Sequence, residues 1–194
     1  MALPPRYIGH HYSHDAAFDP RKGATLEVFL DLHCPFSKKA HFKLKEVVAH
    51  YGKDKLDVVF INWIQPWHPQ ATWLHSALLA ASLFDDKSLF WKLADLLYEK
   101  QDEFRDEKVE KVSKVEFYDL MTTYAKSVGI DEEQFRKNLA SNEVVQLIKW
   151  EQKYGRQNGI HASPTFLVNG LVVGQASSGW TLEQWRELLD PLLA

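Results

Sequence analysis

The sequence contains a single cysteine, Cys34, among its 194 residues. One cysteine cannot close a disulfide within its own chain, and it cannot form a cysteine-rich zinc site. Both of these ways of stabilising a small fold are therefore excluded. The thiol is either a buried side chain that packs as a small hydrophobic group, or a reactive one.

Long apolar segments and charge clusters of one sign are missing as well. No stretch approaches the roughly 20 apolar residues that a membrane-spanning helix needs. The first 23 residues contain neither the apolar core of a signal peptide nor the Arg-rich pattern of a transit peptide. The net charge of −3 comes from interleaved charges, so no basic stripe is offered to nucleic acid. We therefore expect a cytoplasmic protein without a membrane or nucleic-acid partner.

The composition is that of a globular chain, with 45% hydrophobic and 25% charged residues. At this length such a balance supports one good core, with room for a substantial insertion. We expect residues 1–194 to form a single domain.

The first regular unit is a strand, a helix and a second strand within residues 24–63. Apolar side chains alternate with other residues from position 26 to 32, and Val58–Ile61 is typical of a buried strand. Between them, apolar residues recur at helical spacing up to Gly52, where a helix should end. This βαβ unit predicts a parallel pair of strands.

A helical block is expected over residues 68–155. Ser113 with Glu116 has the spacing of a capping box at a helix start, and Asp131 with Gln134 repeats it. The charged run from residue 102 to 116 is typical of a solvated helix face or loop.

The chain should return to strands after residue 155. Thr165–Val168 and Leu171–Val173 flank Asn169-Gly170, a strong hairpin signal because a type I′ turn needs positive φ at both central residues. A helix that starts near Thr181 follows. The predicted fold is therefore α/β with a central mixed sheet, its core formed by residues 24–67 and 156–194 around the insertion.

The sharpest local motif is Cys34-Pro35-Phe36-Ser37, between the first strand and the first helix. Pro35 suits the first helical position, which places Cys34 at the N-cap. Free backbone N–H groups and the positive end of the helix dipole would stabilise a thiolate there. We expect Cys34 to be partly exposed and nucleophilic, with the Ser37 hydroxyl one turn further on and directed at the sulfur.

A second motif is Ser163-Pro164, directly before the predicted hairpin. A proline at the entrance of a strand that must face the cysteine is where a cis peptide bond would be placed. We expect this bond to lie within contact distance of Cys34. The backbone of Ser163 would then be free to pair with an extended substrate.

Together these motifs resemble the DsbA-like branch of the thioredoxin superfamily, from Ala24 to Leu192. In that family the first cysteine of Cys-x-x-Cys attacks disulfides, the second resolves the intermediate, and a cis-proline binds substrate backbone. The resemblance implies a thioredoxin-like fold, with Cys34 as the nucleophile. It also implies that Pro35, Phe36, Ser163 and Pro164 contribute to substrate binding.

The chain departs from the family pattern at the resolving cysteine. Ser37 stands at that position, so the dithiol cycle of DsbA-type oxidases is closed to this sequence. We therefore expect Ser37 to act beside a lone catalytic thiol.

A second departure concerns the buried carboxylate that many thioredoxin-fold enzymes have six residues before the cysteine. This chain has Val28 there, and Glu27 and Asp31 are expected on the opposite face of the strand. Proton transfer would then come from elsewhere. His33 and His161 are candidates, since each lies close in sequence to a site residue.

Other histidines and the tryptophans carry weaker signals. A polar N-terminal tail accounts for His10, His11 and His14, so we expect no metal site and no bound cofactor. His68 and His75 share a helical face without a carboxylate partner at fixed spacing, which favours a structural role. Four tryptophans could build core or line a groove: Trp63, Trp67, Trp73 and Trp91.

The leading functional hypothesis is an enzyme, a monothiol thiol-disulfide oxidoreductase. Cys34 would attack disulfides or mixed disulfides of proteins and peptides, and glutathione or another small thiol would act as cosubstrate.

Three alternatives stay open. Kappa-class glutathione transferases share the insertion but have serine in place of Cys34. Monothiol glutaredoxins have Cys-x-x-Ser and can share an iron-sulfur cluster between two chains, but they lack the insertion. A peptide-binding module could retain the cis-proline edge without a redox cycle. The oligomeric state is also left open.

Overall fold

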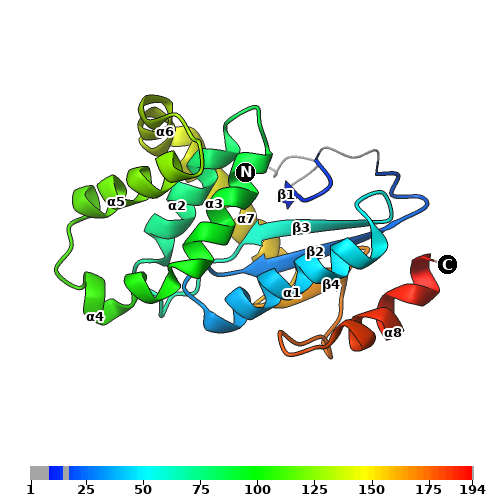
Figure 1. Ribbon diagram of the computed structural model, residues 1–194. Coiled ribbons are helices and arrows are strands. Elements are labelled where there is room, and N and C mark those ends of the chain that lie inside the picture. The colour runs from blue at the N-terminus through cyan, green and yellow to red at the C-terminus, as the bar shows by residue number, and fades with distance from the viewer. Residues whose placement is uncertain (1–8, 15–17, 194) are drawn as a thin grey trace.

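The computed structural model describes residues 9–14 and 18–193, which form a sheet with helices on both faces (Figure 1). The sheet has five strands in the order β1-β3-β2-β4-β5. The strands are β1 (His10–His11), β2 (Ala24–Leu30), β3 (Leu56–Asn62), β4 (Thr165–Val168) and β5 (Leu171–Val172). β2 and β3 are parallel, and the other neighbours are antiparallel. The predicted mixed sheet is confirmed.

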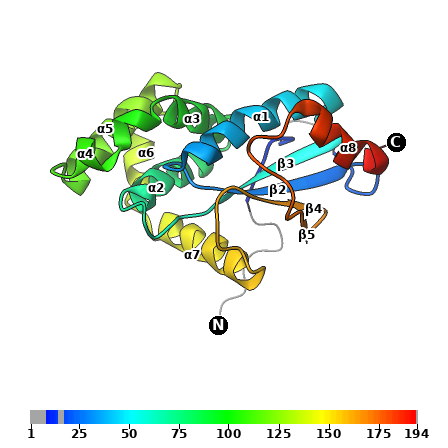
Figure 2. The same cartoon turned by 90° about the horizontal axis from the view of Figure 1, so that it is seen from below.

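The helix α1 (Pro35–Tyr51) joins the two parallel strands and covers one face of the sheet. Its apolar stripe packs with the inward side chains of β2 in one core cluster. Gly52 ends α1 with a φ of 88°, a conformation that glycine adopts without steric cost. The terminal helix α8 (Leu182–Leu193) lies on the same side, as Figure 2 shows.

The segment between β3 and β4 is helical, as the sequence pattern predicts. It contains α2 (Ala71–Ser82), α3 (Ser88–Glu99), the 3₁₀ helix η1 (Gln101–Phe104), α4 (Asp106–Val109), α5 (Lys114–Ser127), α6 (Glu132–Leu139) and α7 (Asn142–Gln157). Ser113 and Glu116 form the expected capping box, and Asp131 caps α6 by accepting from the Gln134 amide. No helix in the described part of the chain is long and apolar enough to cross a membrane.

The helix α7 covers the second face of the sheet (Figure 2). A smaller core cluster lies there, with Phe29, Trp63 and Leu167 among its members. Gly155 permits the close approach, because a Cβ at this position would lie 2.3 Å from the Trp63 ring. The β4–β5 hairpin turns through Asn169 and Gly170 at φ values of 49° and 81°, in agreement with the type I′ expectation.

The N-terminal histidines differ from the sequence prediction. His10 and His11 form the edge strand β1, so a polar tail is the wrong description for them. His10 Nε2 lies 3.0 Å from buried Glu151, and His11 Nδ1 lies 2.5 Å from buried Asp57. The strand is therefore held by side-chain pairs as well as by its backbone. A two-residue strand has no sequence period that could have revealed it.

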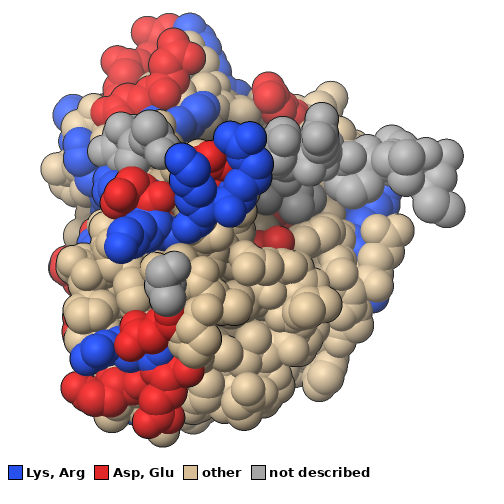
Figure 3. Space-filling view, turned by 90° about the vertical axis from the view of Figure 1, so that its right-hand side faces the viewer, with Lys and Arg blue, Asp and Glu red and all other residues tan. Residues whose placement is uncertain are grey.

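The surface in Figure 3 mixes charges of both signs. On this face Lys and Arg lie beside Asp and Glu, next to a wide area that contains neither. That distribution agrees with the interleaved charges of the sequence.

Candidate active site around Cys34

Cys34 lies where β2 has ended and α1 begins. It is the N-cap of α1, in an extended conformation with φ −79° and ψ 122°, and Pro35 occupies the first turn. The proline has no N–H to leave unsatisfied at this position. The predicted placement of Cys34 at a helix N-terminus is therefore confirmed.

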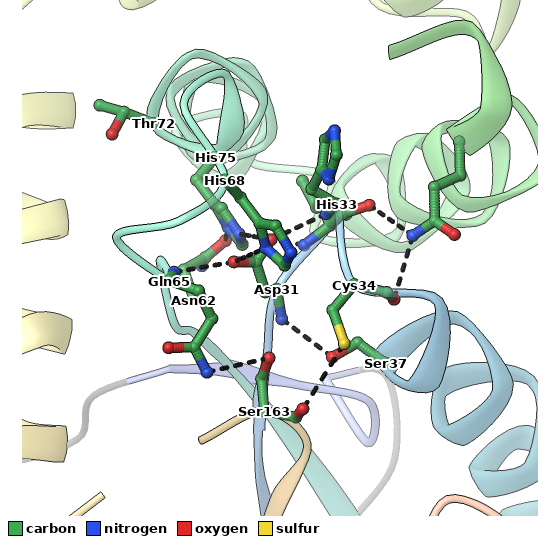
Figure 4. Close-up of polar contacts among 12 residues, drawn as sticks. Asp31, His33, Cys34, Ser37, Asn62, Gln65, His68, Thr72, His75 and Ser163 are labelled. Carbon is green, nitrogen blue, oxygen red and sulfur yellow. Dashed lines mark hydrogen bonds and ion pairs between the residues drawn. The ribbon is translucent and has the colours of Figure 1, made fainter. Parts of the chain in front are cut away.

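The thiol faces the loop before β4. Cys34 Sγ donates to the carbonyl oxygen of Ser163 at 3.5 Å, and the Ser163–Pro164 peptide bond is cis (Figure 4). Residues 34 and 163 are thus brought together from opposite ends of the chain. The Ser163 carbonyl, which we expected to be free for a substrate, accepts from the thiol instead.

Cys34 is more enclosed than the sequence indicated. Only 6% of its surface is exposed, so the expectation of partial exposure is wrong. The helical insertion supplies the reason, because η1 packs over the start of α1. Gln101 Nε2 donates to the carbonyls of Leu32 and Cys34 at 2.8 and 3.1 Å.

The Ser37 hydroxyl has a backbone partner that the sequence did not indicate. Its side chain is fully buried, and its Oγ accepts a hydrogen bond from the Asp31 amide at 3.2 Å. Among the described contacts no hydrogen bond joins the Ser37 hydroxyl to the Cys34 sulfur, although Figure 4 shows the two groups near each other. Ser37 connects α1 to the chain that leaves β2.

Asp31 is the functional residue that the sequence argument misplaced. We expected it on the far face of the strand, but β2 ends at Leu30 and strand alternation stops there. The carboxylate is completely buried and accepts from the His33 and Gln65 amides, both at 2.8 Å. His68 Nδ1 lies 3.0 Å from the same carboxylate. A buried acid therefore does lie beside Cys34, three residues before it in sequence.

The surroundings of Asp31 keep it ionised. Burial opposes the charge, but the interactions with His68, His75 and the Gln65 amide outweigh it, and they hold the pKa of Asp31 well below its usual range. Tyr98 is affected in the opposite direction. Burial, together with the negative charge of Asp31, raises the pKa of Tyr98 well above its ordinary value. Its neutral hydroxyl donates to the Asp31 carbonyl at 3.4 Å.

His75 stands behind Asp31 in a defined protonation state. The Leu32 amide donates to His75 Nε2 at 3.1 Å, so that nitrogen carries no proton. Nδ1 therefore carries it and donates to Asn62 Oδ1 at 2.7 Å. His75 is a neutral structural residue, as expected. No sequence spacing indicated a carboxylate partner for His68 or His75, but in the folded protein both face Asp31, from 3.0 and 3.8 Å.

The two histidines proposed for proton transfer lie in different surroundings. His33 Nε2 is 3.0 Å from the Phe104 carbonyl, and its ring lies 4.7 Å from that of His68. His161 is exposed and contacts the Gly159 carbonyl in its own loop, at 3.1 Å. Neither has a described hydrogen bond to Cys34. His33 belongs to the site cluster, whereas His161 has no described link to it.

Two exposed aromatic side chains adjoin the site in sequence. Phe36 follows the Cys34-Pro35 pair and Trp67 precedes His68, and each is 63% exposed. Trp63 and Trp91 are buried core residues, and Trp73 packs against the core. Phe36 and Trp67 therefore present apolar surface that the fold does not use.

Several site residues were not indicated by the sequence, and they come from the segment after β3 and from the helical insertion. Gln65 Nε2 donates to Ser163 Oγ at 3.3 Å and so ties the segment after β3 to the cis-proline loop. Gln101 and Tyr98 arrive from the insertion, and no spacing connects them to Cys34. Within the described ranges no group of three His, Cys, Asp or Glu side chains could hold a metal ion.

The comparisons with known proteins agree with this architecture. A family model described as Thioredoxin matches residues 20–191, and the chain belongs to that family. A candidate protein-disulfide isomerase from Pseudomonas syringae is 32% identical, with 86% of this chain and 93% of that one covered and a TM-score of 0.76. The thiol-disulfide exchange protein α-DsbA2 from Wolbachia pipientis shares the fold at 17% identity, with 95% and 87% covered and a TM-score of 0.69. The fold is thioredoxin-like, with thiol-disulfide oxidoreductases of the DsbA type among its structural neighbours.

The curated relatives are of another kind. A Na⁺/H⁺ antiporter from Mycolicibacterium vanbaalenii is 31% identical over 143 residues, which are 73% of this chain and 21% of the antiporter. This chain spans about a fifth of the length of the curated relatives it matches.

Proposed function

We propose that this protein is a monothiol thiol-disulfide oxidoreductase. Cys34 attacks a disulfide or mixed disulfide of a protein or peptide, and an external thiol such as glutathione completes the turnover. The reducing thiol pool of a cytoplasm would supply that partner.

The observation that carries the proposal is the position of the Cys34 sulfur. It lies at the N-terminus of a 17-residue helix and points at the Ser163 carbonyl beside cis-Pro164. The positive end of the helix dipole and the free backbone N–H groups of the first turn lie at this position. A substrate backbone that pairs with Ser163 would displace the contact to its carbonyl and release the sulfur for attack.

Ser37 supports the monothiol form of the mechanism. A hydroxyl cannot attack a mixed disulfide, and this one is buried and bonded to the Asp31 amide. The intermediate at Cys34 would therefore wait for a thiol from solution. The exposed rings of Phe36 and Trp67 offer apolar contact to a protein or peptide partner.

The test is to incubate the protein with oxidised glutathione and measure its mass. The expected product carries one glutathionyl group, which persists until an external thiol is added, and Cys34→Ser carries none. Turnover of a glutathionylated peptide should then require added glutathione. If Cys34 never accepts glutathione, the redox proposal is wrong and a peptide-binding module without redox chemistry becomes the better hypothesis.

A further inference from the structure

The loop after β3 contributes a histidine to the site whose second nitrogen has no described partner. His68 Nδ1 contacts Asp31, and no described hydrogen bond involves His68 Nε2. Because Asp31 is ionised and accepts hydrogen bonds only, the proton of the neutral His68 ring lies on Nδ1. Nε2 is therefore the nitrogen with a free lone pair in the neutral ring.

The His68 side chain stands between the buried Asp31 carboxylate and the surface. The Asp31 carboxylate is fully buried, while the His68 side chain is 15% exposed. The Nδ1 edge is turned inward to that carboxylate, and Nε2 belongs to the opposite edge of the ring. Figure 4 shows His68 and Asp31 on the same side of the close-up as Gln65, which reaches across to Ser163.

We propose that His68, oriented by Asp31, is the proton donor and acceptor for the sulfur that leaves or enters during exchange at Cys34. This inference rests on the proposed function and deepens it. Asp31 is a positioning residue in this scheme, since it acts through His68.

The sulfur that needs the proton is the leaving sulfur of the substrate, which lies some distance from Cys34. The three sulfurs of an exchange reaction lie in line, so the leaving sulfur is about two S–S bond lengths, roughly 4 Å, from the attacking one. A proton donor for that sulfur therefore does not need to contact Cys34. His68 has no described contact with the Cys34 sulfur, but its loop is joined to the same cis-proline loop through the 3.3 Å bond from Gln65 to Ser163.

The proton and electron balance closes over one cycle. The Cys34 thiolate forms a bond to the near sulfur of the disulfide, and the far sulfur leaves with the electron pair of the broken S–S bond. That sulfur takes the proton from Nε2 of the His68 imidazolium, so it departs as a thiol while Cys34 is oxidised to the mixed disulfide. Neutral His68 then accepts the proton of the incoming thiol, whose sulfur displaces the Cys34 thiolate and restores the first state.

Several charged or titratable groups surround His68. Asp31 contacts it, the His33 ring lies 4.7 Å away, and neutral His75 lies behind Asp31. Asp106 of α4 approaches His33 at 3.9 Å and is largely exposed. Of these carboxylates, the buried one of Asp31 is in contact with the His68 ring, and the exposed one of Asp106 is not.

The experiment compares leaving groups that need a proton with leaving groups that do not. Oxidised glutathione releases a basic alkyl thiolate, an aromatic disulfide releases a stable thiolate, and iodoacetamide releases iodide. His68→Gln should slow exchange with oxidised glutathione about 100-fold at neutral pH. It should leave the aromatic disulfide and the alkylation within about threefold of the parent. Asp31→Asn should show the same selective loss, and His50→Gln, at the exposed far end of α1, should behave like the parent.

The pH profile gives a second readout. In the parent, exchange with oxidised glutathione should lose its proton-assisted component as His68 deprotonates with rising pH, and His68→Gln should lack that component. Equal slowing of all three reagents would mean a structural role for His68 and would overturn the inference.

A measurement on the parent alone covers the case in which the variants fail to fold. Rates against disulfides with increasingly basic leaving thiols should depend only weakly on basicity when a proton donor assists. A steep dependence would refute the role of His68. If Cys34 reacts with neither disulfide while iodoacetamide still alkylates it, the proposed function itself fails, and that outcome is distinct from a failure of the His68 assignment.

Discussion

The buried carboxylate of Asp31 should stabilise the folded protein at neutral pH, although burial by itself opposes its charge. It accepts from two backbone amides at 2.8 Å and lies 3.0 Å from His68 Nδ1. In Asp31→Asn one oxygen could still accept from Gln65 and His68. The new NH₂ group would then face the His33 amide, so two donors would point at each other without an acceptor.

The loss of stability expected in Asp31→Asn can be worked out from those contacts. A hydrogen bond to a charged acceptor contributes about 1.5–3 kcal/mol, and a buried donor left without a partner costs about 1–3 kcal/mol. The variant no longer buries a charge, and this gain offsets part of the two losses. We expect Asp31→Asn to lower the free energy of unfolding by about 2–4 kcal/mol at pH 7, from the hydrogen-bond magnitudes just given. Urea denaturation measures this directly.

The stability that Asp31 contributes should depend on pH, in a direction set by its pKa. The pKa of Asp31 is held well below its usual range in the folded protein, so its contribution is fully present above the unfolded pKa of about 3.9. It is lost as the pH falls toward the folded value. The difference between parent and Asp31→Asn should therefore shrink in acid. Asp119→Asn, which breaks an exposed pair with Arg136, is the matched control and should cost no more than about 1 kcal/mol. A cost for Asp31→Asn as small as the control's, or one that does not change with pH, would refute the reasoning.

Three further predictions concern other parts of the molecule. Gly155→Ala should lower the free energy of unfolding by about 1–2 kcal/mol in urea denaturation, because overpacking against Trp63 exceeds the gain in helix propensity. The control Gly174→Ala, where a Cβ meets nothing within 4 Å, should leave stability unchanged, and equal effects of the two variants would contradict the packing argument. The hydrogen bond to Asp57 raises the pKa of His11 in the folded protein. The loss of stability in His11→Gln, measured by thermal unfolding, should therefore be fully present below pH ~6.5 and decline as the pH rises past the pKa of the folded state. A loss that grows with pH would contradict a stabilising His11–Asp57 interaction. Ser37→Cys should form an internal disulfide with Cys34 on oxidation and expel bound glutathione, as mass spectrometry would show; persistence of the glutathione adduct would mean that the two positions cannot pair.

Much of the fold was predictable because its signals are local. The alternation before Cys34, the helical spacing after it and the Asn169-Gly170 turn each depend on residues a few positions apart. Capping at Ser113 and Asp131 is local in the same sense. The placement of Cys34 at the N-cap followed from Pro35 alone.

The site was only partly predictable, since its polar contacts join distant segments. The contact from Cys34 to Ser163 spans 129 positions, and the contact from Gln65 to Ser163 spans 98. Asp31 was misplaced because strand alternation was extended one residue beyond the strand's end at Leu30. The enclosure of Cys34 was missed because η1, which covers it, belongs to the insertion.

The sequence by itself determined the order of the elements, the lone thiol at a helix start and the serine that replaces a second cysteine, because each depends on neighbouring residues or on a simple count. Only the tertiary structure decided which side chains surround that thiol. Hydrogen bonding between distant residues is specified by how the strands, helices and loops pack, and this packing brings Asp31, His68 and Gln65 together beside Cys34. No periodicity in the chain encodes that arrangement.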